Sequence, residues 1–112
     1  MGELRDPSLE LAKRILTEVD FENRLTGFNL QERAGAQPVW MYNFKEVVSL
    51  LNAPRPCLDF EELESWIREI MGDQGLAAQI AVAIKKGQSD QDRISLMRHL
   101  MELRLDQCKK LV

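Results

Sequence analysis

Residues 90–112 read DQDRISLMRHLMELRLDQCKKLV, a helical pattern whose apolar side chains cover about half of the circumference. One apolar stripe repeats at helical spacing, and leucines on either side widen it. The stripe contains Ile94, Met97, Met101, Leu105, Cys108 and Val112, and the leucines are Leu96, Leu100, Leu103 and Leu111. A surface helix needs a narrower stripe. We therefore expect this segment either to pack in the middle of a helical bundle or to offer part of its apolar arc to a second chain.

One basic residue interrupts the apolar arc of this helix. Arg104 falls between Met97 and Leu111 on the helical wheel. A guanidinium that is buried without a partner is costly, so three arrangements are open. Arg104 extends to the edge of the core, pairs with an acid from another helix, or faces a partner protein or ligand, and we favour the first.

Composition and charge limit the class of protein. The 112 residues predict a single domain, residues 1–112, that is large enough to bury a core. The net charge of −3 disfavours a general affinity for nucleic acid or for anionic membranes. We find neither a signal peptide nor an apolar run long enough to span a membrane, and we expect a cytoplasmic protein.

Capping residues predict where the helices begin. Each one places a side-chain oxygen before an apolar run, where it can accept the free amides of the first turn. The predicted starts are Asp6-Pro7, Asn43, Asp59, Asp73 and Ser89 or Asp90. The first helix is expected to run to about Asp20, and Lys85-Lys86-Gly87 is expected to end the fourth, with the glycine suited to a left-handed backbone.

Residues 21–42 lack a persistent period, so we expect an irregular connection that contains aromatic side chains. Its Pro38–Tyr42 run is the only strand-like stretch, and it is brief. The simpler interpretation is that the aromatic residues fold back as a lid on the helical core. The functional interpretation is that Trp40, Met41 and Tyr42 form an exposed anchor for a partner, because such residues are enriched at the centres of interfaces.

Catalytic and metal-binding patterns are missing from the sequence. The single histidine, His99, forms one His-x-x-Glu pair with Glu102, which is too few ligands for a di-metal bundle. Cys57 and Cys108 have no metal-type spacing, and a disulfide between them stays open. No serine lies in a nucleophile motif, and no phosphate-binding loop is present. We expect no enzyme activity, no metal and no cofactor.

These patterns predict an all-α fold: a compact bundle of four main helices plus one or two short ones. The predicted function is that of a non-enzymatic protein-interaction module, such as a small adaptor, regulator or accessory subunit. It would use the surplus apolar surface of the last helix to bind another protein or a second copy of itself. The candidate interaction residues are Trp40, Met41, Tyr42, Met97, Met101, Arg104 and Cys108.

Two alternatives remain open. In the first, Arg104 binds an anion in a pocket lined by Met97, Met101 and Trp66 of a helical bundle. In the second, residues 76–84, a short turn and the last helix form a helix-turn-helix that binds DNA. The acids Asp90 and Asp92 at the start of that last helix would repel phosphates, so we rank this alternative lower.

Overall fold

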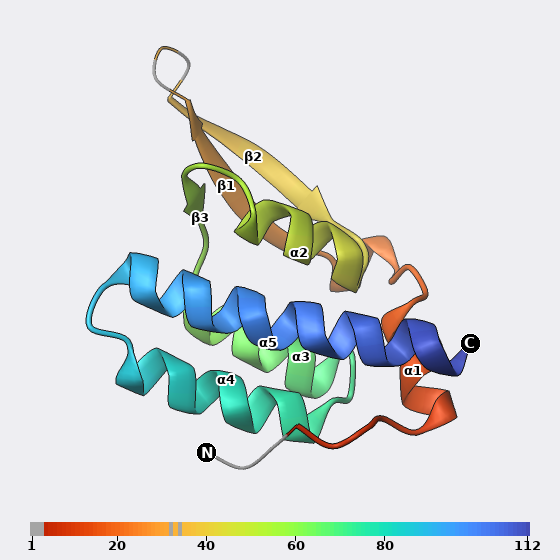
Figure 1. The fold of residues 1–112 in the computed structure, drawn as a ribbon. Helices are drawn as coiled ribbons and strands as arrows, with labels where there is room; N and C mark the ends of the chain where they lie inside the picture. Colours follow the sequence, from red (N-terminus) through yellow and green to blue (C-terminus); the bar gives the residue numbers. More distant parts are fainter. Residues whose placement is uncertain (1–3, 32, 34) are drawn as a thin grey trace.

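The computed structural model describes residues 4–31, 33 and 35–112, in which helices pack beside a three-stranded antiparallel sheet (Figure 1). The helices are α1 (Leu9–Ile15), the 3₁₀-helix η1 (Phe21–Asn23), α2 (Phe44–Leu51), α3 (Phe60–Glu69), α4 (Gln74–Lys86) and α5 (Asp90–Leu111). The strands are β1 (Leu25–Gln31), β2 (Gly35–Met41) and β3 (Pro56–Cys57). The prediction of an all-α bundle is therefore wrong, because residues 21–42 contain two strands instead of an irregular connection.

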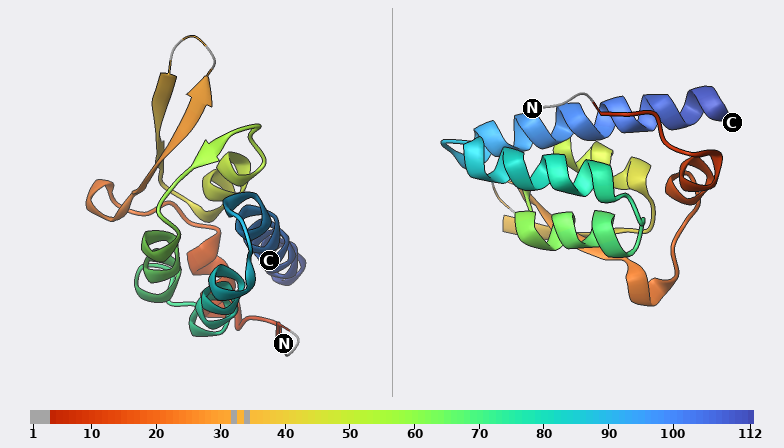
Figure 2. Two further views of the ribbon diagram at one scale, coloured as in Figure 1. Left: turned by 90° about the vertical axis from the view of Figure 1, so that its left-hand side faces the viewer. Right: turned by 90° about the horizontal axis from the view of Figure 1, so that it is seen from below.

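The sheet has the strand order β2-β1-β3, with β1 antiparallel to both neighbours. Leu25 lies opposite Met41 at the base of the β1–β2 hairpin. Phe28 lies opposite Pro38 on one side and opposite Cys57 on the other. Figures 1 and 2 show that the hairpin extends away from the helices. Only its base contributes to the core.

Alternating apolar residues do not reveal the hairpin in the sequence, because the covered face of its strands contains few large apolar side chains. Side chains along a strand point alternately to the two faces of a sheet. The covered face of β1 carries Leu25, Gly27 and Asn29, so the alternation ends after one large apolar residue. Pro38 in the middle of β2 also argues against a strand, although an edge strand accepts it.

The last helix, α5, lies along one side of the helical part of the molecule, with one side buried and the other facing solvent. It packs against α1, α2 and α4, as Figures 1 and 2 show. Most of the apolar arc of α5 therefore belongs to the core, but the helix is not enclosed on all sides as a position in the middle of a bundle would require. Three leucines of the arc stay 38–44% exposed: Leu96, Leu103 and Leu111.

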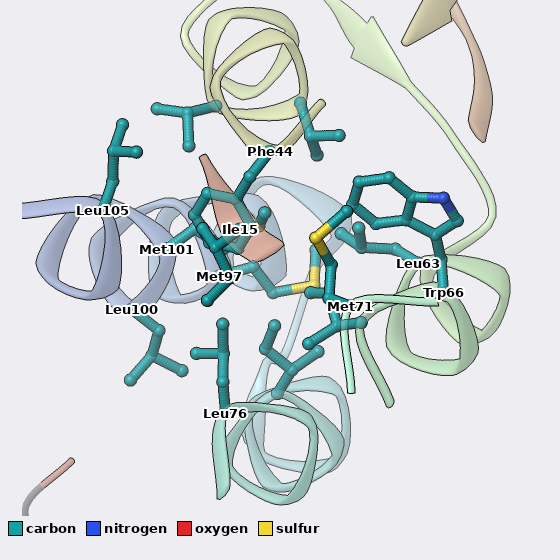
Figure 3. Packing of buried hydrophobic residues seen from close by; sticks show 14 of the residues in the cluster. Ile15, Phe44, Leu63, Trp66, Met71, Leu76, Met97, Leu100, Met101 and Leu105 are labelled. Carbon is teal, nitrogen blue, oxygen red and sulfur yellow. The ribbon is translucent and has the colours of Figure 1, made fainter. Parts of the chain in front are cut away.

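The core is formed by side chains from all five α-helices and from the base of the hairpin. Figure 3 shows Ile15 of α1, Phe44 of α2, Leu63 and Trp66 of α3, Leu76 of α4, and Met97 and Met101 of α5 in one cluster. Trp66 is 5% exposed, and its indole N–H donates a hydrogen bond to the carbonyl oxygen of Asn23 at 2.7 Å. This bond holds the segment before the hairpin against α3.

Most of the predicted helix caps are confirmed. The side chains of Asn43, Asp59, Asp73 and Ser89 each accept a hydrogen bond from a backbone N–H in the first turn. The first helix differs, because Ser8 caps it and it ends at Ile15. Gly87 has an extended backbone with φ −62° instead of the left-handed conformation expected. A Cβ at Gly87 would collide with Arg93, so close packing explains this glycine.

Candidate interaction surface

The sheet has one face that α2 covers and one that no helix covers, which we call the outer face. It is formed by Thr26, Phe28, Leu30, Ala36, Pro38, Trp40 and Cys57. The register pairs Trp40 with Thr26 and Leu30 with Ala36, and directly paired residues share a face. Phe28 is 40% exposed, Leu30 44% and Trp40 52%. Three large apolar side chains therefore stand together on a surface open to solvent.

Gly27 explains why the opposite face lies so close to α2. A Cβ at this glycine would stand 2.5 Å from Cδ2 of Leu50 and 3.3 Å from the carbonyl oxygen of Cys57. Leu50 of α2 therefore packs directly against the backbone of β1. This contact determines which face of the hairpin is buried, and it leaves Phe28 and Trp40 on the other.

Pro38 limits how another chain could approach the sheet. It has no N–H, so the Phe28 and Pro38 pair cannot exchange two backbone hydrogen bonds, and the nitrogen of Pro38 faces away from β1. The free edge of β2 consequently lacks a donor in its middle. Proline at this position opposes the addition of a further strand. A partner is therefore more favourably bound by the outer face than by the edge.

Charge is distributed unevenly around the sheet. The three strands contain no charged residue, whereas Arg24, Arg33 and Arg55 lie just beyond their ends. The guanidinium of Arg24 lies 3.9 Å from the ring centre of Phe21. Arg33 and Arg55 are exposed, and no described residue forms an ion pair with either. Glu32 lies outside the described residues. Glu46 lies at the base of the sheet, where it accepts from the N–H that follows β2, so the basic residues mark the starts of β1 and β3 and the hairpin turn.

The three neighbours Trp40, Met41 and Tyr42 do not form one surface. Trp40 points to the outer face, whereas Met41 is completely buried at the base of the hairpin. Tyr42 is partly buried, and its backbone N–H donates to Oε1 of Glu46 at 2.8 Å. The alternation of a strand separates adjacent residues in this way. The outer face brings Trp40 together with Phe28, Leu30 and Pro38. The sequence pattern that could have predicted this group is the two-residue spacing within each strand, which puts Phe28 with Leu30 and Pro38 with Trp40 on one face.

The candidate residues of α5 lie in the interior. Met97, Met101 and Cys108 have no exposed surface. Burial raises the pKa of the Cys108 thiol, while the charge of Arg104 acts in the lowering direction and that of Asp73 in the raising direction. A second protein could not contact these three side chains without displacing the helices that cover them.

Arg104 pairs with an acid from the start of α4, which is the second of the three arrangements considered. Its Nε lies 2.8 Å from Oδ2 of Asp73, and the two side chains are 4% and 2% exposed. Its Nη1 donates to the carbonyl oxygen of Arg5 at 2.7 Å and to Oε1 of Gln107 at 2.9 Å. The guanidinium is consequently paired with an acid and only 3% exposed, so it does not face an open pocket in which an anion could bind.

The helices α4 and α5 do not have the geometry of a DNA-reading unit. They run side by side in opposite directions (Figures 1 and 2), whereas the helices of a helix-turn-helix cross at about 90–120°. The first turn of α5 presents Asp90 and Asp92, both exposed. Asp90 forms an ion pair with Arg93 at 3.0 Å, which reduces the positive charge available to a phosphate.

Metal-binding and membrane-spanning features are both absent from the part of the chain that the structure describes. That part contains no group of three or more His, Cys, Asp or Glu residues that could hold a metal ion. Its two cysteines are free, Cys57 at the sheet surface and Cys108 in the core. Within the same residues, no helix has both the length and the apolar character needed to cross a bilayer.

Comparisons of the chain with protein-family models, with curated protein sequences and with solved structures found no match. The functional interpretation of the outer face therefore depends on its own geometry and chemistry.

Proposed function

We propose that this protein is a non-enzymatic interaction module that binds an apolar segment of another protein on the outer face of its sheet. The observation that carries this proposal is the exposure of Phe28, Leu30 and Trp40 together on one face. Contiguous exposed apolar surface is characteristic of interaction sites. Tryptophan in particular is enriched among the residues that contribute most to binding.

The charge around the sheet supports a partner of a particular chemistry. Arg24, Arg33 and Arg55 surround strands that are themselves uncharged. A segment with an apolar centre and acidic flanks complements this arrangement. A second copy of the chain would bring the same basic residues to the interface, so we propose a different protein as the occupant. We also place the interaction in the cytoplasm, an assignment that the two free thiols favour.

A second candidate surface for the same function lies on α5. Leu96, Leu103 and Leu111 are 38–44% exposed along one side of this helix. We rank it below the outer face because the side chains between them are largely buried, Leu100 being 6% exposed. The two surfaces lie on different elements, so single substitutions can separate them.

Selection from a random peptide library tests the proposal, because it requires no natural partner in hand. Peptides would be selected on the wild-type protein, and their affinities measured by fluorescence anisotropy. We expect enrichment of apolar sequences flanked by Asp and Glu. Trp40→Ser should weaken their binding at least tenfold, on the order of 1.4 kcal/mol. Leu103→Ser, which removes a comparably exposed side chain from α5, should leave it unchanged.

Three outcomes would overturn the proposal. Loss of peptide binding in Leu103→Ser but not in Trp40→Ser would move the site to α5. If the selected peptides lacked Asp and Glu beside their apolar centre, the proposal that the partner segment has acidic flanks would be wrong. Light scattering that shows a dimer in the wild type and a monomer in Trp40→Ser would identify a second copy as the occupant of the outer face.

A further inference from the structure

A cavity of about 440 Å³ lies between the loop that follows α2 and the first half of α5. Pro54 and Ile94 contribute apolar walls, and Gln91 and Ser95 contribute polar side chains from α5. Arg55 and Arg98 also line it. The volume is within the range of about 300–1,000 Å³ that is typical of small-molecule sites. This cavity belongs neither to the outer face of the sheet nor to the buried Arg104 pair.

The two arginines of the cavity have no partner among the described residues. Neither guanidinium forms an ion pair with an acid there, and no acid lines the cavity. Glu102 lies one helical turn after Arg98 and would be its natural partner. Instead, Oε1 of Glu102 accepts a hydrogen bond from Nδ2 of Asn52 at 3.0 Å. Two positive charges thus face one cavity without an acid to neutralise them.

The side chains of the cavity suit an anion on an organic body. A guanidinium presents paired N–H groups that match a carboxylate or phosphate, and two of them supply charge as well as direction. The amide of Gln91 and the hydroxyl of Ser95 can donate further hydrogen bonds. Pro54 and Ile94 offer contact to carbon atoms. Neither inorganic phosphate nor a neutral aromatic compound would use all of these groups.

We propose that this cavity binds a small organic anion. Arg55 and Arg98 hold its phosphate or carboxylate group, and Pro54 and Ile94 contact its apolar body. The cavity shares Arg55 with the basic residues near the sheet, whereas Arg98 lies on α5 and outside the sheet. Arg98→Gln therefore tests the cavity separately from the outer face. It keeps the class of ligand expected from the sequence and moves it away from Arg104, which is buried and paired with Asp73.

Titration with phenyl phosphate and benzoate tests the proposal by chemical-shift changes in ¹H–¹⁵N spectra. We expect shifts that concentrate on residues 51–56 and 91–98. Arg98→Gln should weaken binding of the bound anion at least tenfold, and Arg55→Gln should weaken it as well. Arg33→Gln is the matched control, because it removes an exposed arginine at the hairpin turn, and it should leave the affinity unchanged. Thermal unfolding of each variant would verify that its fold is intact.

Several results would overturn the proposal. The absence of saturable chemical-shift changes with either anion would show that the cavity does not bind them. If Arg33→Gln weakened anion binding as much as Arg98→Gln, the binding would be non-specific attraction between charges. Phenol binding as tightly as phenyl phosphate would exclude recognition of the anionic group. Inorganic phosphate binding as tightly as phenyl phosphate would exclude the apolar contacts. A preference for phenyl phosphate over benzoate, or the reverse, decides which anion the arginines favour.

Discussion

Asp73 binds Arg104 with the same carboxylate oxygen that caps α4. Its Oδ1 accepts hydrogen bonds from the backbone N–H of Leu76 at 3.0 Å and from Nη2 of Arg104 at 3.3 Å. One buried acid therefore connects the start of α4 to the second half of α5. Gln107, one turn after Arg104, adds a bond from its Nε2 to the carbonyl oxygen of Leu4 at 3.0 Å. Three parts of the chain meet at this polar group inside an apolar core.

Separating the two charges should destabilise the protein strongly. Arg104→Met leaves the carboxylate of Asp73 buried without its cation, and Asp73→Asn leaves the guanidinium without its anion. We expect each substitution to lower the free energy of unfolding by about 3–5 kcal/mol. Urea denaturation of both variants and of the double variant measures this. The double variant should lose less free energy of unfolding than the two single variants lose together. A loss equal to their sum would contradict the pairing of Arg104 with Asp73.

Glycine substitutions should have opposite effects at two positions. Gly27→Ala places a methyl group 2.5 Å from Leu50 and should cost about 1–3 kcal/mol through overpacking. Gly75→Ala, in the first turn of α4, meets no atom nearer than 3.8 Å. It should stabilise the protein by about 0.5 kcal/mol, because alanine favours a helix. The urea midpoints of the two variants should therefore move in opposite directions, and a neutral Gly27→Ala would refute the close contact.

The buried thiol of Cys108 should make stability fall in alkaline solution. Burial raises its pKa in the folded state, so the folded protein retains a proton that the unfolded chain loses near its ordinary pKa of about 8.5. The unfolded state then binds fewer protons, and the free energy of unfolding falls as pH rises, by at most about 1.4 kcal/mol per pH unit. Cys108→Ala, measured by urea denaturation at pH 7 and pH 10, should show a smaller decrease. Identical decreases in both proteins would rule out this origin.

The two tryptophans should be distinguishable by fluorescence. Trp40 is 52% exposed on the outer face, whereas Trp66 is 5% exposed and hydrogen-bonded. In Trp66→Phe only the exposed Trp40 remains, so the emission should lie at long wavelength and acrylamide should quench it readily. In Trp40→Phe only the buried Trp66 remains, so the emission should lie at shorter wavelength and resist quenching. Trp66→Phe should also cost about 1–3 kcal/mol, because the carbonyl of Asn23 loses its donor. Equal quenching of the two variants would contradict the exposure of the outer face.

The helices could be predicted because their signals are local. A cap such as Asn43 or Asp59 and the apolar spacing behind it lie within a few residues, and the same residues form the cap in the structure. The length of α1 was less predictable. Its apolar spacing continues to Val19, but the N–H of Val19 donates to the carbonyl oxygen of Tyr42 instead of continuing the helix. A contact between distant segments thus overrides the local pattern.

The hairpin and the binding surfaces depend on relationships that the sequence does not display. Gly27 marks a close approach only once Leu50 is known to lie above it. Arg104 could be recognised as an exception within an apolar arc, but its partner Asp73 lies 31 positions earlier. Likewise, nothing local shows that Arg55 and Arg98 line one cavity. Such pairings are set by packing between elements rather than by propensity.

The bonds from α5 to the first described residues have a consequence for how the chain folds during synthesis. Arg104 and Gln107 bind the carbonyl oxygens of Arg5 and Leu4 across 99 and 103 positions. At about 5–20 residues per second, a ribosome reaches Arg104 on the order of 5–20 s after Arg5. During that interval α1, α2 and α4 lack the helix on which they pack. The apolar faces of the helices already synthesised therefore remain exposed to solvent until α5 emerges. Chaperones that bind exposed apolar segments can act on the nascent chain during this interval.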